Sequence, residues 1–173
     1  PWFENPPGYQ FLHCLVNDAE GGSSTAVDGF AVANFLKKYH LKKFELLTKN
    51  DVVFKDNDYT QKNIRIQKSP IIKTNKHNDI EEVRINLGAM GTLDINPKIM
   101  NNFYEAYALF YKQLHSKKFQ IEFKLKAGDI FCFDNRRILH GRKEFDPNSG
   151  NRHLQGYYIE REEIKSKLNY LNG

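Results

Sequence analysis

The stretch "FDNRRILHGR", residues 133–142, decides how the rest of this chain is interpreted. Apolar residues before it give way to an Asp-Asn pair and two arginines, and a single histidine, His140, then stands between Leu139 and Gly141. A histidine in such a β-rich stretch is most often a packed residue with a modest role. The other interpretation is that His140 holds a ligand, and the rest of the sequence has to decide between the two.

The composition indicates one compact globular domain over residues 1–173. The 173 residues are 40% hydrophobic and 13% aromatic, which suffices for a sizeable core. The net charge of +5 comes from lysines spread along the chain, which indicates solvated faces rather than a patch for nucleic acid. No stretch reaches the roughly 18 apolar residues of a membrane span, and no signal-peptide pattern is present. We therefore expect neither a nucleic-acid nor a membrane partner.

The two cysteines, Cys14 and Cys132, lie far apart in apolar, strand-like surroundings. Their spacing matches neither a zinc motif nor a disulfide framework. We expect two free, buried thiols in a reducing compartment, which means the cytoplasm or, in a eukaryotic cell, the mitochondrial matrix.

Residue periodicity predicts a mainly β fold with helical insertions. Asp28 is expected to cap a helix, and Asn96 with Pro97 to begin the helix of residues 97–116, whose aromatic face indicates core packing. Strands and helices do not alternate as βαβ units, so we expect an antiparallel sandwich or barrel, with a jelly roll (double-stranded β-helix) as the favoured member. Further strands are expected at 8–16, within 51–87, and at 119–125, 130–134 and 153–160, with short helices at 42–49 and 161–171.

A metal-binding role for His140 requires partners. Non-haem Fe(II) sites that activate oxygen use two histidines and one carboxylate, and leave the remaining coordination positions open. In a jelly roll two of these ligands come as a His-x-Asp or His-x-Glu pair on an earlier strand. The formal match here, His77-Asn78-Asp79, lies in the polar loop "KTNKHNDIEE", where nothing would hold it rigid. We reject it as a metal site.

Two further features suit an anionic ligand. Arg152 follows His140 by twelve residues, across a turn, and its guanidinium could grip a carboxylate with two parallel hydrogen bonds. Taken alone, a surface arginine in a hairpin is the commoner explanation. The stretch "EGGSS", residues 20–24, would let the backbone turn tightly and would offer the hydroxyl of Ser23 or Ser24.

Together these motifs resemble the C-terminal half of the γ-butyrobetaine and trimethyllysine hydroxylases, a family related to taurine dioxygenase. The resemblance implies Fe(II), 2-oxoglutarate and O2, with ascorbate as reductant. In that family a His-Thr-Asp motif precedes a Pro-aromatic pair, so the resemblance implies that the other two iron ligands lie just upstream of Pro1. The matching segments are "GYQFLHCL", "GGSSTAVDGF", "VRINL", "LKAGDIFCFDN", "DNRRILHGR" and "NRHLQGYY".

By the same resemblance, His140 would be the third iron ligand and Arg152 would bind the distal carboxylate of 2-oxoglutarate, assisted by Ser24 in preference to Ser23. Tyr158, six residues after Arg152, matches part of an aromatic cage for a trimethylammonium group, which has no N–H to donate. Asn86 matches a substrate-contacting position, and its other interpretation is a residue of a strand-end turn.

The sequence also departs from the family pattern. Arg136 stands where relatives usually carry Trp, and the polar pair expected after Asn86 is absent from "VRINLGAM". The closing "REEIKSKL" looks more like trimethyllysine hydroxylase. The expected function is hydroxylation of a small trimethylammonium substrate, γ-butyrobetaine to L-carnitine in carnitine biosynthesis. The alternatives are hydroxylation of trimethyllysine or another small molecule, or a non-catalytic jelly-roll binding domain. The resemblance also implies a homodimer.

Overall fold

The structure is a computed structural model that describes residues 7–60 and 62–173. The described residues form two compact units, which we treat separately. The first comprises residues 7–27 and Ile121–Gly173, and the second comprises Asp28–Gln120. No helix in the described ranges combines the length and the hydropathy that crossing a membrane requires.

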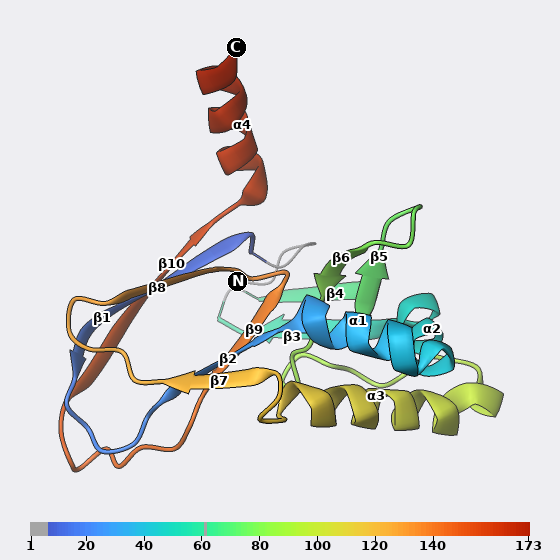
Figure 1. Cartoon of the computed structure of the whole chain (residues 1–173), viewed down its shortest axis with the longest axis horizontal. Coiled ribbons are helices and arrows are strands. Elements are labelled where there is room, and N and C mark those ends of the chain that lie inside the picture. The colour runs from blue at the N-terminus through green and yellow to red at the C-terminus, as the bar shows by residue number, and fades with distance from the viewer. Residues whose placement is uncertain (1–6, 61) are drawn as a thin grey trace. The chain divides into compact units, whose positions relative to one another are not determined.

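The first unit is built on two three-stranded sheets (Figure 1). One sheet has the order β10-β1-β8 and the other β7-β2-β9. Non-consecutive strands are therefore neighbours throughout, as the jelly-roll prediction requires. The strands are β1 (Tyr9–Asn17), β2 (Ser24–Asp28), β7 (Gln120–Phe123), β8 (Ile130–Asp134), β9 (Ile138–Arg142) and β10 (Arg152–Ile159).

Strand β1 is the centre of its sheet and is antiparallel to both neighbours. Gln10 lies opposite Tyr158 of β10 and opposite Phe133 of β8. Successive side chains of a strand point to opposite faces, so these three share one face. Phe133 is buried on that face, whereas Cys132 points the other way and is exposed. The expectation of two buried thiols is therefore correct for Cys14 and wrong for Cys132.

Aromatic contacts join the two sheets. Phe123 of β7 meets Phe131 of β8 with ring centroids 5.0 Å apart. The His140 ring of β9 lies 4.6 Å from the ring of Phe133. These contacts bring the inner faces of the two sheets together, as in a β-sandwich.

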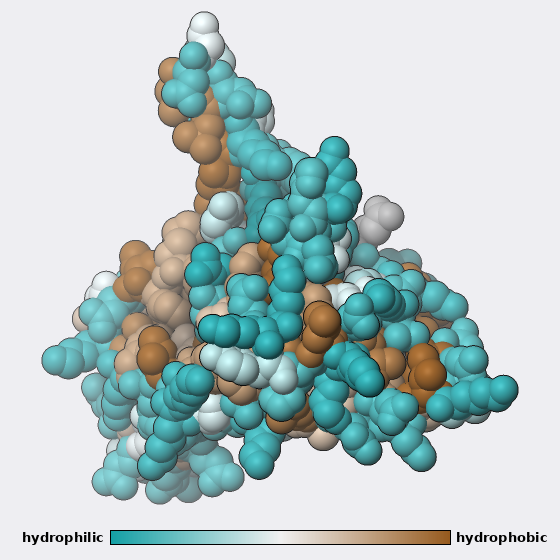
Figure 2. Space-filling model, turned by 45° about the vertical axis from the view of Figure 1, so that its right-hand side comes forward, coloured by the Kyte–Doolittle hydropathy of each residue, from teal (hydrophilic) through white to brown (hydrophobic). Residues whose placement is uncertain are grey.

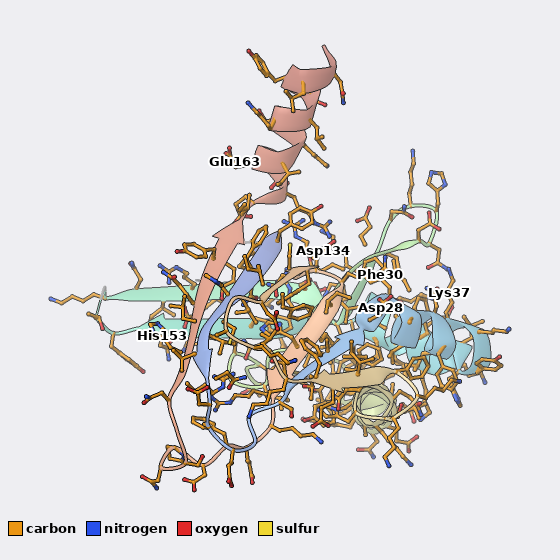
Figure 3. The ribbon with its side chains drawn as sticks, turned by 60° about the vertical axis from the view of Figure 1, so that its left-hand side comes forward. Asp28, Phe30, Lys37, Asp134, His153 and Glu163 are labelled. Atoms are coloured by element: carbon orange, nitrogen blue, oxygen red, sulfur yellow. The ribbon has the colours of Figure 1, made fainter. Side chains whose placement is uncertain are left out.

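Helix α4 (Arg161–Asn172) follows β10 and stands clear of the sheets (Figure 1). Its start is held by an ion pair between Arg161 and Asp134, and Asp134 lies at the end of β8 (Figure 3). Leu168 and Leu171 are exposed, and Figure 2 shows hydrophobic surface along one side of this helix. The predicted closing helix is confirmed.

The second unit combines three helices with two β-hairpins (Figure 1). Its core is formed by the inward faces of the helices, where Leu36, Phe44, Phe103 and Phe110 are at most 1% exposed. The elements are α1 (Gly29–Tyr39), α2 (Leu41–Lys49), β3 (Asp51–Asp58), β4 (Asn63–Pro70), β5 (Ile72–Thr74), β6 (Ile80–Val83), the 3-10 helix η1 (Pro97–Ile99) and α3 (Met100–Leu114).

Both predicted helix caps are present. The Asp28 carboxylate accepts hydrogen bonds from the backbone N–H groups of Phe30, at 2.9 Å, and Ala31, at 3.3 Å (Figure 3). Asn96 accepts a bond from the backbone N–H of Lys98 at 2.9 Å, with Pro97 in the first turn. Side-chain acceptors at this position satisfy N–H groups that have no partner within the helix.

A buried ion pair lies at the end of β6. The Glu82 carboxylate accepts two bonds from the Arg84 guanidinium, at 2.7 and 2.6 Å, and the two residues are 3% and 5% exposed. The Gln67 side chain accepts a further bond from Arg84, whose guanidinium lies 5.4 Å from the ring of Phe54. The charge of Arg84 is thus satisfied entirely inside the protein.

This pair makes a testable prediction for stability. Glu82→Ala should reduce the free energy of unfolding by about 3–5 kcal/mol, because it leaves a buried guanidinium uncompensated. The double variant Glu82→Leu/Arg84→Met should recover most of that loss, because it removes both charges. Urea titration followed by circular dichroism measures both values, and an additive double variant would contradict the prediction.

Candidate functional site

His140 lies on β9 with its ring against that of Phe133. The surrounding protein lowers the pKa of His140 below its usual range through burial, which disfavours the charged imidazolium. The residue nevertheless keeps solvent-accessible surface, so it is crowded by protein and still open to a ligand. The neutral imidazole favoured here is the form that binds metal ions.

Ser24 begins β2, which pairs with β9. The backbone N–H of Lys143 donates to the Ser23 carbonyl at 2.9 Å, and that of Gly22 donates to the Glu144 carbonyl at 2.8 Å. Continued along the strands, this antiparallel pairing puts Ser24 and His140 on the same face of the sheet. Ser24 is 7% exposed, as expected for the inner face.

Ser23 points to the opposite face. Its hydroxyl and the Lys143 ammonium both bind the carboxylate of Glu122, with the Lys143–Glu122 distance at 2.5 Å. The hydrogen bond from Lys143 is the main reason why the pKa of Glu122 is lowered. The geometry therefore favours Ser24 over Ser23 as the hydroxyl available to an inner ligand.

Arg152 begins β10, and its guanidinium lies 5.6 Å from the ring centre of Phe145. Arg142 approaches the same ring at 4.4 Å. Burial first, and the positive charge of Arg142 second, lower the pKa of Arg152. Within the described part of the chain, the buried Nε of Arg152 has no hydrogen-bond partner. A buried donor without a partner beside a second cation is suited to an anion.

Gly22 provides the space that Arg152 occupies. Its φ of +68° is in the left-handed region that favours glycine. A Cβ at this position would lie 3.3 Å from the Arg152 Nε and 3.2 Å from the Cβ of Phe145. The glycine pair of "EGGSS" thus allows both the turn and the close approach of the arginine.

Tyr158 and Arg152 occupy one face of β10, because they are separated by an even number of residues in a regular strand. Tyr157 points to the other face, opposite Phe11. His153 also points away from Arg152 and lies at the opposite end of the sheet from Asp134 (Figure 3). Arg142 and Phe145 were not singled out in the sequence, although Arg142 follows His140 at the two-residue spacing of a shared strand face.

Asn86 belongs to the second unit, whereas the other predicted site residues belong to the first. Its side-chain oxygen accepts bonds from the backbone N–H groups of Gly88, at 2.9 Å, and Ala89, at 3.2 Å. This is the geometry of an Asx turn. A contact between Asn86 and substrate stays a prediction.

Arg136 lies in the turn between β8 and β9. Its backbone N–H donates to the Asp134 carboxylate at 3.0 Å, which stabilises the turn. In the ranges that the structure describes, its buried Nε has no hydrogen-bond partner. Nothing in the structure explains why arginine occupies this position.

The described residues contain no group of three His, Cys, Asp or Glu side chains that could hold a metal ion. His140 is therefore a single candidate ligand here, and the prediction places the other two ligands upstream of Pro1. The lowered pKa of His140 fits a metal ligand, and the unpartnered Arg152 Nε fits a carboxylate.

The two facing sheets define a double-stranded β-helix. A solved structure titled "AAD-2 in complex with Mn(II) and N-oxalylglycine" aligns with a TM-score of 0.67 and 15% sequence identity, and the match covers 89% of this chain and 63% of that one. The fold is thus that of the jelly-roll dioxygenases. The family model described as "Taurine catabolism dioxygenase TauD, TfdA family" matches residues 1–158, so the chain belongs to that family.

Sequence relatives make the comparison finer. The γ-butyrobetaine dioxygenase of Pseudomonas sp. strain AK-1 is 39% identical over 168 residues, a match that covers 97% of this chain and 43% of the relative. The trimethyllysine dioxygenase of Meyerozyma guilliermondii is 33% identical over 176 residues, which covers 99% of this chain and 43% of the relative. The chain spans less than half the length of these relatives.

The role of Gly22 is open to a direct test. Gly22→Ala should weaken binding of N-oxalylglycine to the metal-loaded full-length protein by at least about tenfold, because a Cβ displaces Arg152 from its position. Gly128→Ala is the matched control, since Gly128 has φ +93° but nothing within 4 Å of a Cβ. Both variants carry the backbone cost of a positive φ, and only Gly22→Ala adds a contact with Arg152 and Phe145. Equal effects on ligand affinity, measured by calorimetry, would contradict the role of Gly22.

Proposed function

We propose that the full-length protein is an Fe(II)- and 2-oxoglutarate-dependent dioxygenase that hydroxylates γ-butyrobetaine to L-carnitine. The observation that carries the proposal is the surroundings of Arg152 on the inner face. Its buried Nε has no partner in the described chain, and Gly22 leaves room beside it. Ser24 on the inner face of the second sheet, and 39% identity to a γ-butyrobetaine dioxygenase, support it.

Each inner residue has a distinct task in this proposal. His140 holds iron through its neutral imidazole, together with a His and an Asp expected upstream of Pro1. Arg152 grips the distal carboxylate of 2-oxoglutarate, and the Ser24 hydroxyl donates to the same group. The second cation, Arg142, strengthens the preference of this position for a dianion. Bound iron, keto acid and O2 supply the oxidising chemistry, with ascorbate as reductant.

Substrate recognition is assigned to the aromatic end of the same face. Tyr158 shares the face with Arg152 and is 46% exposed, which leaves its ring available to a ligand. A trimethylammonium group cannot hydrogen-bond, so an aromatic face is the suitable partner. Asn86 is proposed as a further substrate contact.

Trimethyllysine is the second candidate substrate, favoured by 33% identity to a trimethyllysine dioxygenase. It carries the same trimethylammonium group, so Tyr158 would serve either molecule. A non-catalytic binding domain is the alternative of another class. We also propose a homodimer located in the cytoplasm or the mitochondrial matrix.

The activity test uses full-length protein with Fe(II), 2-oxoglutarate, ascorbate and O2. Succinate should accumulate only when a trimethylammonium substrate is added, and γ-butyrobetaine should exceed trimethyllysine in kcat/KM. Absence of coupled succinate with both substrates would favour the binding-domain alternative, and a higher kcat/KM for trimethyllysine would select the second candidate.

Arg152→Ala should raise the KM for 2-oxoglutarate by about a hundredfold, the order expected for loss of a charge-assisted bidentate contact. The KM for the trimethylammonium substrate should change far less. Steady-state kinetics with each component varied in turn measures both constants. An equal rise in the KM for 2-oxoglutarate and the KM for the trimethylammonium substrate would show that the role assigned to Arg152 is wrong.

Tyr158→Leu should weaken binding of the trimethylammonium substrate by about tenfold, because it removes an aromatic face from the cation. Tyr158→Phe should retain most of the affinity, since the ring remains. Tyr157→Leu is the control on the opposite face of β10 and should bind normally. If the Tyr157 variant is the weaker binder, the assignment of faces is wrong.

A further inference from the structure

Gln10 is a buried polar residue that is not one of the proposed site residues. It lies on the central strand β1 and is 5% exposed. Its side-chain amide makes no hydrogen bond to the described residues, and it is not among their fully buried atoms without a partner, so it stays open to solvent or to a ligand. An amide in this position can exchange a contact with water for a contact with a ligand.

The register of β1 shows where this amide points. Gln10 lies directly opposite Tyr158 on one side and Phe133 on the other. Side chains paired in this way have Cβ atoms about 4.5–5.5 Å apart. The Phe133 ring in turn contacts His140 at 4.6 Å. Gln10 therefore stands between the proposed cation-binding ring and the aromatic neighbour of the proposed iron ligand.

The ligand group at this level belongs to the substrate rather than to the keto acid. Arg152 is six residues from Tyr158 along β10, which corresponds to about 20 Å of strand. A five-carbon keto acid that joins Arg152 to the iron at His140 would cover only part of that distance. The part of the face that Gln10 shares with Tyr158 is left for the organic substrate.

The chemistry of a trimethylammonium group fits a neutral acceptor here. Its positive charge is spread over methyl C–H groups, which attract carbonyl oxygens through weak C–H···O contacts. An amide carbonyl supplies that partial negative charge without the cost of burying a carboxylate. The free amide oxygen of Gln10, next to an aromatic face, would complete such an environment.

We propose that Gln10 is a specificity-determining residue whose side-chain oxygen contacts the trimethylammonium group held by Tyr158. The inference deepens the proposed function and rests on it. It assigns to β1 a contact that makes the site selective for a cation over a neutral group of the same shape.

The test compares two ligands that differ only in charge. γ-Butyrobetaine and its carbon analogue 5,5-dimethylhexanoate are titrated by calorimetry into full-length protein loaded with Mn(II) and N-oxalylglycine. Gln10→Leu should weaken the binding of γ-butyrobetaine by about tenfold, the order of one contact to a charged group. The binding of 5,5-dimethylhexanoate, whose tert-butyl group is uncharged, should not change. The affinity for N-oxalylglycine should not change.

Gln155→Leu provides the matched control, because Gln155 is exposed on the opposite face of the same sheet, paired with His13. Gln155→Leu should leave the affinity for both ligands unchanged. Gln10→Glu is a second variant that keeps the shape of the side chain. It should raise the ratio of γ-butyrobetaine affinity to neutral-analogue affinity above that of the wild type.

Three results would overturn the inference. One is an equal loss of affinity for γ-butyrobetaine and 5,5-dimethylhexanoate in Gln10→Leu. Another is a loss of affinity for N-oxalylglycine in the same variant. The third is an unchanged affinity ratio in Gln10→Glu. Failure of the wild-type protein to bind γ-butyrobetaine would overturn the proposed function together with the inference, whereas normal wild-type binding with an unaffected Gln10→Leu would overturn the inference alone.

Discussion

The first unit depends on the pairing of β1 with β8 and β10 at the same time. One register along this central strand sets Gln10, Phe133 and Tyr158 on the inner face together. A slip by one residue would turn all three outward, because the side-chain period of a strand is two. The irregularity between Cys14 and Val16 absorbs the extra residue Leu15 and leaves β10 regular. Arg152 and Tyr158 thus remain on one face.

That inner face has two ends of different chemistry. At one end Arg142 and Arg152 share the ring of Phe145, next to the glycine turn that precedes β2. At the other end lie Tyr158 and Phe133, and the latter carries the contact with His140. Such a separation suits two ligands bound side by side, an anion at the arginines and an organic cation at the aromatic rings.

Local rules were enough for much of this arrangement. Asp28 and Asn96 are caps because they are short acceptors placed directly before helical periodicity. The shared face of Arg152 and Tyr158 follows from strand alternation once that strand is recognised. Exposure is harder to predict, as Cys132 shows. An apolar strand of five residues does not reveal which of its faces is covered.

The amino-acid sequence by itself determined the family and most of the strands and helices, although not β2 or β9, and it made His140 the candidate iron ligand, because these depend on residue type and short-range spacing. Tertiary structure decided which neighbours become partners. The choice of Ser24 over Ser23 depends on the pairing of β2 with β9, and the burial of Gln10 depends on β8 and β10. Those pairings join segments more than a hundred residues apart, and no local pattern encodes a register between strands so distant in the chain.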